Sequence, residues 1–461
     1  MNLEQLDLSD TICAIATPAG MGGIAVIRIS GVKSYAVVDS IFHSRRIKLA
    51  DADANSIHFG IIKSEDQIID EVLVSKFKGP NSFTGEDTIE IACHGAIYIQ
   101  QSILKLLQQH GCRLAMPGEF TMRAFSNGKI DLSQAEAVAD LIAAESAASH
   151  KLAMHQMRGG VAQKLNELRS QLIEFTALLE LELDFAEEDV AFADRNKFEA
   201  LLNSICHEIT QLLATFSFGN AIKNGIAVAI VGPPNAGKST LLNMLLQEER
   251  AIVSNIPGTT RDTIEEKITI EGHLFRLIDT AGIRQTTDPI EKLGVARSQE
   301  KIHQSDIVMM MYDCTNYEIE ELKAAIDSIP PDKHVLLLAN KIDLTKSKLF
   351  AFEKVTMHLE ISALDGKGIL SLKEALIKIV NDHIGVATAD VILTNQRHYD
   401  ALQQALNTLA LVKQQMDHNI SADLLCIDLR AAIRLIGNIT GTIDIDTDIL
   451  GTIFSKFCIG K

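Results

Sequence analysis

The 461-residue chain lacks the usual sequence features of a membrane or exported protein. It has no run of about 18 apolar residues, the length that a membrane-spanning helix needs. Its first residues, MNLEQLDLSD, carry acidic side chains where a secretory signal peptide has a basic segment followed by an apolar one. Its seven cysteines include no C-x-x-C pair, which argues against a disulfide framework. We therefore expect a cytoplasmic protein with reduced cysteines.

Basic residues are few relative to acidic ones. Lys and Arg number 43 against 60 Asp and Glu, which gives a net charge of −17. A broad nucleic-acid surface needs a local excess of basic residues, so any RNA contact must be local or shared with a partner. The 47% of hydrophobic residues is typical of folded proteins. The length is about three times that of an ordinary domain, which predicts several domains.

The hydrophobic pattern changes along the chain. Residues 11–30 and 57–92 hold short β-rich runs separated by turn residues, which predicts a small α/β domain. From about Glu119 apolar residues recur at helical spacing. Between residues 225 and 382 short apolar runs alternate with helical stretches, as in a mostly parallel sheet flanked by helices, and the pattern then becomes helical again. We predict a multidomain α/β plus all-α protein with boundaries at 1–120 (N-terminal α/β), 121–222 (helical, first part), 223–383 (inserted α/β domain) and 384–461 (helical, second part).

A phosphate-binding motif opens the inserted domain. The segment IAVAIVGPPNAGKSTLLNMLL places Gly232, Gly237, Lys238 and Ser239 between a strand and a helix, the context that a P-loop requires. The glycines let backbone amides face phosphate oxygens, Lys238 neutralises these oxygens, and Ser239 can ligate Mg²⁺. The candidate nucleotide contacts here are Asn235, Ala236, Gly237, Lys238, Ser239 and Thr240.

Two downstream motifs predict that the base is guanine. Asn340-Lys341-Ile342-Asp343 follows the apolar run HVLLLAN, and the Asp343 carboxylate can accept hydrogen bonds from both guanine N1–H and the exocyclic amine. Ser362-Ala363-Leu364 can then place a backbone N–H on the guanine oxygen. The candidate base contacts are Asn340, Lys341, Asp343, Ser362, Ala363 and Leu364.

Two further motifs lie between the P-loop and the guanine motif. Asp279-Thr280-Ala281-Gly282 follows the run FRLIDT, where a carboxylate can hold a Mg²⁺-bound water and Gly282 can donate to the γ-phosphate. Thr260, in GTTRD, is a candidate second Mg²⁺ ligand. The order of these five elements is that of a translation-factor-class GTPase, which predicts a Ras-like P-loop GTPase domain.

The residue after Gly282 departs from the Ras-like pattern. Ras-like enzymes have a glutamine there that orients the attacking water, whereas this chain has Ile283. Asp288 and Glu291 are both candidates for positioning the water. Arg284 could stabilise charge or simply lie on the surface.

The motifs PNAGKSTLLN, GTTRD, DTAGIR and NKID, read together with the flanking sequence, resemble the MnmE (TrmE) family of tRNA uridine-modification GTPases. The resemblance extends to DTICAIATPAGMGGIAVIRISG, PNSFTGEDTIEIACHG, PGEFTMRAFSNGKIDLSQAEAVADLI, LDFAEEDV and the terminal CIGK, so it covers essentially the whole chain.

The resemblance implies an N-terminal domain that dimerises and binds a tetrahydrofolate derivative (5,10-methylene or 5-formyl), a discontinuous helical domain and an inserted G domain. It implies a role with a FAD-dependent flavoprotein partner, MnmG, in a heterotetramer. Together they would attach an aminomethyl or carboxymethylaminomethyl group to C5 of the wobble uridine of certain tRNAs, with folate as the one-carbon donor.

The resemblance also assigns residues. Folate contacts fall on Arg28, Glu86, Lys129 and Lys461. A K⁺ site falls on Asn235, Ser254, Ile256 and Thr259, where the cation would replace an arginine finger as two G domains meet. The nucleotide-binding switch segment comprises Ser254, Asn255, Ile256, Pro257, Gly258, Thr259 and Thr260.

Four residues carry candidate catalytic roles: Glu291, Arg284, Lys238 and Cys458. The resemblance selects Glu291 as the residue that orients water through an intermediary. A Cys458 thiolate could add to C6 of uracil and activate C5, or the side chain could pack beside Phe457 and Ile459.

Other features have plainer interpretations. We expect the Met309 to Met311 run to be a buried strand, and the Cys93-His94 pair to lie in a core. A different function class also fits the G motifs: a GTP-switch ribosome-assembly or RNA-binding factor without one-carbon chemistry. Such a factor usually has a basic RNA-binding domain, which this chain does not show.

Overall fold

The computed structural model describes residues 9–44, 47–65, 67–184, 195–249, 266–278, 299–345, 350, 352–384, 391–418 and 420–441. The chain divides into two compact units. The first comprises Met1–Ala139, Gln156–Phe192 and Ser421–Lys461, and the second comprises Asp140–His155 and Ala193–Ile420. Helices α4 (Leu132–Ala143) and α5 (Ala147–Met157) each contain a point of division. The domain boundaries given above stay a prediction.

The first unit contains a seven-stranded sheet, with strand order β3-β4-β5-β6-β2-β1-β7. All neighbours are antiparallel except β1 and β7, which are parallel. The strands are β1 (Ile12–Ile15), β2 (Ile24–Ser30), β3 (Phe42–His43), β4 (Ser56–Ser64), β5 (Gln67–Phe77), β6 (Thr88–His94) and β7 (Arg113–Leu114).

Helices cover one face of this sheet. Alternate strand residues such as Ile27, Ile91 and Val74 pack against α1 (Ser34–Ile41) and α2 (Ile97–Gln109) in one apolar core. The period-two alternation of β6 explains this, because every second side chain points to the same face. The unit also contains a 3₁₀ turn (Leu49–Asp51) and the helices α3 (Glu119–Ser126), α6 (Gly160–Asp184) and α15 (Ala422–Thr440), the last two of which pack along each other.

The second unit contains a six-stranded sheet of order β13-β12-β11-β8-β10-β9. Every neighbouring pair is parallel except the β9–β10 hairpin. The strands are β8 (Ile226–Val231), β9 (Glu266–Ile270), β10 (His273–Leu277), β11 (Ile307–Asp313), β12 (His334–Asn340) and β13 (Val355–Glu360). The unit's helices are α7 (Arg195–Ala214), α8 (Phe216–Asn224), α9 (Lys238–Glu249), α12 (Ile319–Asp327), α13 (Ile369–Ile384) and α14 (Gln396–Asp417).

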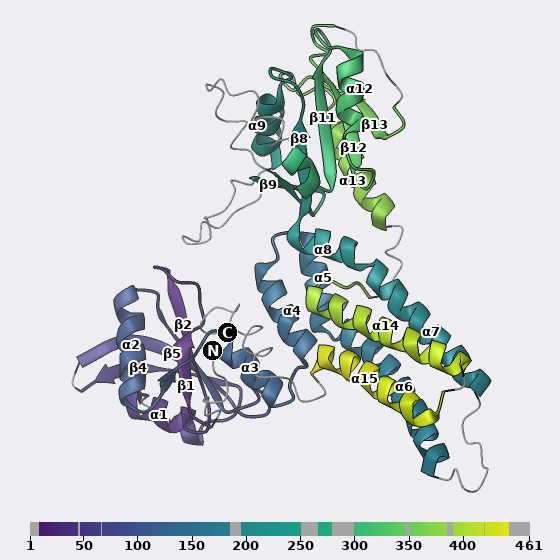
Figure 1. Cartoon of the computed structure of the whole chain (residues 1–461). Helices are drawn as coiled ribbons and strands as arrows, with labels where there is room; N and C mark the ends of the chain where they lie inside the picture. The colour runs from purple at the N-terminus through teal and green to yellow at the C-terminus, as the bar shows by residue number, and fades with distance from the viewer. Residues whose placement is uncertain are drawn as a thin grey trace. The chain divides into compact units, whose positions relative to one another are not determined.

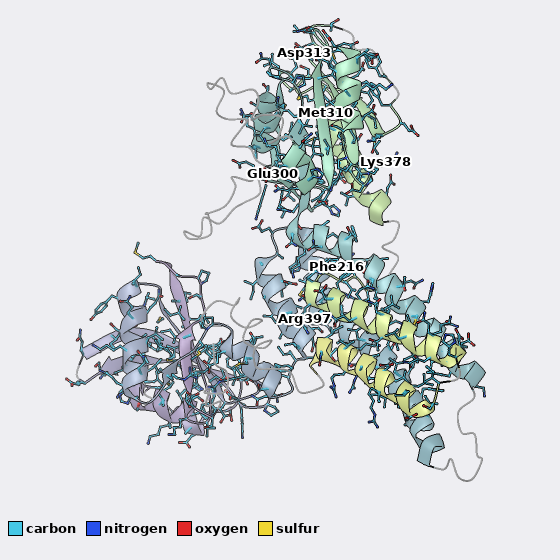
Figure 2. All side chains as sticks on the ribbon, in the orientation of Figure 1. Phe216, Glu300, Met310, Asp313, Lys378 and Arg397 are labelled. Atoms are coloured by element: carbon cyan, nitrogen blue, oxygen red, sulfur yellow. The ribbon has the colours of Figure 1, made fainter. Side chains whose placement is uncertain are left out.

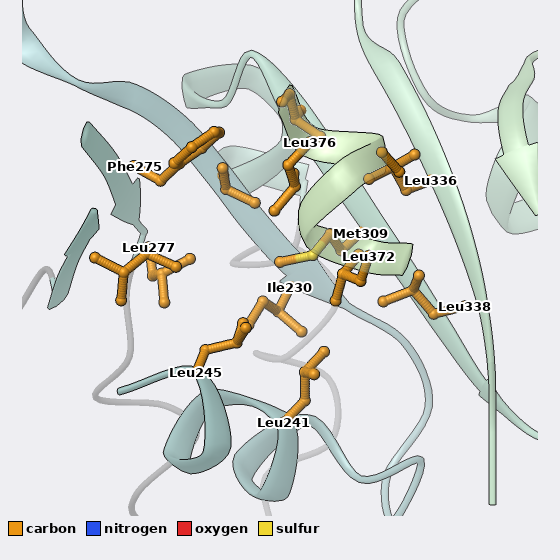
Figure 3. Close-up of a cluster of buried hydrophobic side chains, with 14 of the residues drawn as sticks. Ile230, Leu241, Leu245, Phe275, Leu277, Met309, Leu336, Leu338, Leu372 and Leu376 are labelled. Atoms are coloured by element: carbon orange, nitrogen blue, oxygen red, sulfur yellow. The ribbon is translucent and has the colours of Figure 1, made fainter. Parts of the chain in front are cut away.

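Both faces of this sheet are buried. Ile230, Met309 and Leu338 pack on one side with residues of α9 and α13 (Figure 3). On the other side Val231, Met310 and Tyr312 pack with residues of α12. The run Met309 to Met311 is thus a buried strand, as predicted from its continuous apolar sequence.

Helical segments precede and follow the parallel sheet. Helix α7 comes before β8, α14 comes after α13, and these two helices pack side by side (Figure 1). Two further contacts hold these helical segments together. The ring centroids of Phe216 and Tyr399 lie 4.6 Å apart, and Lys413 donates a hydrogen bond to Asn203. The predicted fold class, an N-terminal α/β sheet with helices and an inserted mostly parallel P-loop sheet, is confirmed.

Candidate functional site

The P-loop lies between the fully buried strand β8 and helix α9, and its backbone requires glycine at two positions. Gly232 has φ 147°, and a Cβ there would lie 2.1 Å from the carbonyl oxygen of Met311. Gly237 has φ 100°, and its Cβ would lie 2.2 Å from the Asn340 side-chain nitrogen. Both values are shorter than any normal contact, so a side chain at either position would displace the loop. The two motif glycines therefore permit close packing against β11 and β12.

Lys238 begins α9 and turns back over the loop. Its Nζ donates to the carbonyl oxygens of Gly232 and Pro233, both at 2.7 Å. Burial, with a smaller effect from the nearby charge of Lys301, lowers the pKa of Lys238. An ammonium placed at the start of a helix, beside the loop amides, is suited to bind phosphate oxygens. Ser239 follows it in the first turn of α9 and is half-buried, whereas Asn235 and Thr240 are exposed.

Asn340 connects the three loops that carry the nucleotide motifs. It ends β12 and its side chain is 3% exposed. Its Nδ2 donates to the Ala236 carbonyl in the P-loop at 2.7 Å, and its Oδ1 accepts from the Ala363 backbone N–H at 2.9 Å. Both polar groups of the amide are thus used within the protein. Asn340 fixes the distance between the phosphate-binding loop and the two base-binding loops.

The two charged residues of the guanine motif are held by different partners. The Asp343 carboxylate accepts from the Ser362 hydroxyl at 2.7 Å, and Ser362 Oγ accepts from the Asp365 backbone N–H at 3.2 Å. Lys341 has φ 68° and pairs through Nζ with Asp313. Asp313, which is labelled in Figure 2, is the last residue of β11. Burial alone would raise the pKa of Asp313, but hydrogen bonds from Lys341 and Thr315 hold it below its usual value.

Asp313 was not among the residues predicted from sequence. The sequence feature that could have identified it is its position at the carboxyl end of a buried parallel strand, where binding residues gather in α/β sheets. The structure thus brings together Asn235 to Thr240, Asn340, Lys341, Asp343 and Ser362 to Leu364 at one edge of the sheet. Leu364 is 75% exposed, next to the buried Ala363.

Many predicted residues lie outside the described part of the chain. They are Ser254, Asn255, Ile256, Pro257, Gly258, Thr259, Thr260, Asp279, Thr280, Ala281, Gly282, Arg284, Glu291, Cys458 and Lys461. Their roles stay predictions.

A second candidate site surrounds the loop of residues 79–87 in the first unit. Arg28 on β2 pairs with Glu90 on β6 at 2.8 Å, and its guanidinium lies 4.7 Å from the ring centre of Phe83 and 5.7 Å from that of Phe120. The Phe83 ring is 39% exposed. Arginine stacking therefore holds an exposed aromatic face at the tip of this loop.

Glu86 and Lys129 lie at the same loop. The Glu86 carboxylate accepts from Ser30 Oγ at 2.7 Å and from Arg123 Nη1 at 3.2 and 3.3 Å. Lys129 donates to the Pro80 carbonyl at 2.8 Å, and its side chain lines the space beside Gly85. The three described residues that the resemblance assigned to folate, Arg28, Glu86 and Lys129, thus gather around one loop.

This loop is rigid for local reasons. Ser82 Oγ donates to the Glu86 carbonyl at 2.5 Å, and the Glu86 N–H donates to Thr84 Oγ1 at 3.2 Å. The Asn127 amide donates to the Thr84 carbonyl at 2.8 Å, and the Gly79 N–H donates to Asp87 at 3.0 Å. Few backbone torsions can change without breaking one of these bonds, so the loop presents its side chains in a fixed arrangement.

The prediction that Cys93 and His94 both lie in a core is wrong for His94. Cys93 faces the helix-covered side of the sheet, and burial raises the pKa of its thiol to about 11. His94 points to the opposite face, is 69% exposed and pairs through Nδ1 with Asp70 at 2.7 Å. The strand's alternation separates the two neighbours. Among the described residues, no three His, Cys, Asp or Glu side chains gather as a metal site.

None of the described helices combines the length and the apolar composition that crossing a bilayer requires.

Comparison with known proteins gives two family matches. Residues 11–129 match the family described as "GTP-binding protein TrmE N-terminus", and residues 132–458 match the "MnmE helical domain". The chain is 49% identical over 466 residues to the tRNA modification GTPase MnmE of Flavobacterium johnsoniae, covering 98% of this chain and 99% of the relative. It is also 49% identical over 460 residues to that of Flavobacterium psychrophilum, covering 98% and 99%.

Among solved structures, the chain is similar to Aquifex aeolicus Era, in a crystal structure of a single-residue variant bound to GDP and AlF4⁻. The identity is 28% with a TM-score of 0.24, covering 33% of this chain and 55% of that one.

Proposed function

The chain belongs to the MnmE family of tRNA modification GTPases, and we propose that it hydrolyses GTP within the enzyme that modifies C5 of wobble uridine in tRNA. The observation that carries the proposal is the presence, in one chain, of a connected guanine-nucleotide site and a separate rigid loop suited to folate. A GTP-switch factor without one-carbon chemistry would need only the guanine-nucleotide site.

The nucleotide site has the groups that GTP binding needs. The P-loop amides and Lys238 would hold the phosphates, and Asp343 would accept from the guanine N1–H and amine. Asn340 holds the loops at a fixed separation, and its amide keeps a second N–H with which it would contact the base. Ser239, with Thr260, would ligate Mg²⁺, which would neutralise charge on the phosphates.

The loop of residues 79–87 offers one group for each part of a reduced folate. Glu86 can accept from the amide-like edge of the pterin, Phe83 offers an aromatic face, and Lys129 can attract the glutamate carboxylates. Arg28 pairs with Glu90 and stacks against the Phe83 ring, so its main effect in this structure is to hold that ring in place. We propose that this loop, with Lys461, binds a 5,10-methylene- or 5-formyl-tetrahydrofolate.

Membership of the family supports a proposal of two partners. We propose that the chain forms a homodimer and joins a FAD-dependent flavoprotein, MnmG, in a cytoplasmic heterotetramer that acts on tRNA. Because this chain has a net charge of −17, the partner would supply most of the basic surface for tRNA. Glu291 would orient the attacking water with Arg284 nearby, and Cys458 would act on the uracil ring.

K⁺ dependence is a first prediction. We expect GTP turnover to be about tenfold or more faster in K⁺ than in Na⁺ at equal ionic strength, because a cation held by Asn235 would stabilise charge as the phosphate bond breaks. Asn235 has φ 62°, a conformation that glycine adopts easily, so N235G removes the amide without backbone strain. N235G should turn over GTP at one rate in both salts. Equal rates for the unchanged chain would contradict the K⁺ site.

The modification role is tested by nucleoside mass spectrometry of total tRNA from cells with and without this gene. We expect the C5-aminomethyl-type wobble uridines to disappear on deletion and to return when the gene is restored. An unchanged uridine profile in cells without a second copy would favour the ribosome-assembly switch. GTP-dependent cosedimentation with ribosomal subunits would then be the next measurement.

A further inference from the structure

Arg123 is a buried guanidinium that the sequence analysis did not single out. It lies on α3, is 1% exposed, and contacts three carboxylates. Its Nη2 bonds to Asp10 at 2.5 Å and to Glu119 at 3.0 Å. Its Nη1 bonds to the Asp10 carbonyl at 2.8 Å and to both oxygens of Glu86. Its Nε is buried and has no hydrogen-bond partner in the described part of the chain.

Such a group is weak evidence for stability. Taking a charge out of water carries a penalty that ion pairs only partly offset, and an unsatisfied buried N–H adds to it. An apolar side chain of similar size would often serve the core as well. The function of this guanidinium therefore has to lie in its effect on the carboxylates that it contacts.

The three carboxylates do not depend equally on Arg123. Asp10 and Glu119 also pair with Arg113, both at 2.5 Å. Glu119 accepts in addition from the Met116 N–H at 2.8 Å. Glu86 has no other ion pair among the described residues, and its remaining side-chain hydrogen bond comes from Ser30. Removing Arg123 would leave Asp10 and Glu119 paired but would release Glu86 from its cation.

The bonds to Glu86 leave it able to bind a ligand. Arg123 Nη1 lies at nearly equal distances, 3.2 and 3.3 Å, from the two oxygens, while Ser30 takes Oε2. A carboxylate offers about four lone-pair sites, so Oε1 keeps the capacity to accept again. The side chain is 19% exposed, so the carboxylate reaches solvent while Arg123 and Ser30 hold its orientation.

We propose that Arg123 is a positioning residue that holds the Glu86 carboxylate in place to accept hydrogen bonds from a ligand with adjacent N–H donors. The inference rests on the proposed tetrahydrofolate function of this loop. Without Arg123, the Glu86 side chain would turn toward water, away from Asp10 and Glu119. Ligand binding would then carry the entropic cost of ordering this side chain again.

The test is calorimetric binding of 5-formyltetrahydrofolate to the full chain and its variants. E86A removes the acceptor, and R123M removes its support. R113M is the matched control, because Arg113 contacts Asp10 and Glu119 but not Glu86. R123K keeps the charge and serves as the second variant if R123M does not fold. Melting temperatures report the structural effect of each change.

We expect R123M to weaken binding about tenfold or more, and R123K to recover part of that loss. R113M should lower the melting temperature yet bind within about threefold of the unchanged chain. In the E86A background, R123M should weaken binding no further, since the group that it positions is gone. A loss with R123M that matches that of R113M, or that persists fully in E86A, would overturn the positioning role. If the unchanged chain binds no 5-formyltetrahydrofolate, the proposed folate function itself fails.

Discussion

An asparagine in place of Asp343 should lower GTP affinity by about a hundredfold or more and create affinity for xanthosine triphosphate. The carboxylate can accept from two adjacent donors of guanine, and charge-assisted hydrogen bonds of this kind contribute about 1.5–3 kcal/mol each. Asparagine replaces one acceptor by a donor, which would then face a donor of guanine. Xanthine carries a carbonyl oxygen where guanine has the amine, so the pairing would be restored.

The measurement is competition of GTP and xanthosine triphosphate for a fluorescent nucleotide. The matched control is D365N, which changes an aspartate in the neighbouring loop after β13 that is 43% exposed and pairs only weakly with Lys367 at 3.5 Å. This control should bind GTP like the unchanged chain. The assignment of Asp343 to the base fails if D343N keeps its preference for GTP. Because Asp343 accepts from Ser362 at 2.7 Å, a loss of both nucleotides would instead indicate a collapsed loop.

The second large effect is expected for N340D. An aspartate at this position would place a carboxylate 2.7 Å from the Ala236 carbonyl, where the amide now donates. The site is 3% exposed, so the charge would be buried without a cation, a change that typically costs about 3–5 kcal/mol. We expect a lower melting temperature and at least a hundredfold loss of GTP affinity, since the P-loop and the base-binding loops would separate.

Lowering the pH tests whether the buried charge of the N340D aspartate causes the loss of GTP affinity. Burial without a cation raises the pKa of a carboxyl group, so the variant aspartate would bind a proton as the pH falls from 8 toward 5.5. The neutral acid can donate to the Ala236 carbonyl again, and GTP affinity should partly recover. The control N407D places the same change on the exposed face of α14, where Asn407 accepts from Gln403. It should bind GTP normally at both pH values. Equal binding by N340D and the unchanged chain would rule out the connecting role.

Much of the nucleotide site could be predicted from the sequence because its chemistry is local. Gly232, Gly237 and Lys238 belong to one short segment between a strand and a helix, and their spacing alone predicts a phosphate loop. Asp343 was predicted in the same way, because it lies in the motif Asn340-Lys341-Ile342-Asp343 downstream of the phosphate loop and its carboxylate can accept from two donors of guanine. The parallel sheet followed from continuous apolar runs, which only a strand buried on both faces requires.

Other assignments were incomplete because they depend on what lies across the fold. His94 was expected in a core, yet the alternation of β6 turns it to the open face and toward Asp70. Asn340 was predicted as a base contact, and the structure adds that its amide also bonds to Ala236 and Ala363, which are 104 and 23 residues away in sequence. Nothing local to Asn340 signals either partner.

The sequence by itself determined the class of this protein, a multidomain chain with an inserted P-loop GTPase domain, and the segments that carry its motifs. Only the tertiary structure decided which groups support them. Asp10, Glu86 and Arg123 are separated by up to 113 residues along the chain and come together only in the folded unit. A motif reports backbone and side-chain requirements within a few residues. The orientation of a carboxylate or the separation of two loops is set by contacts between distant residues, which a linear pattern does not contain.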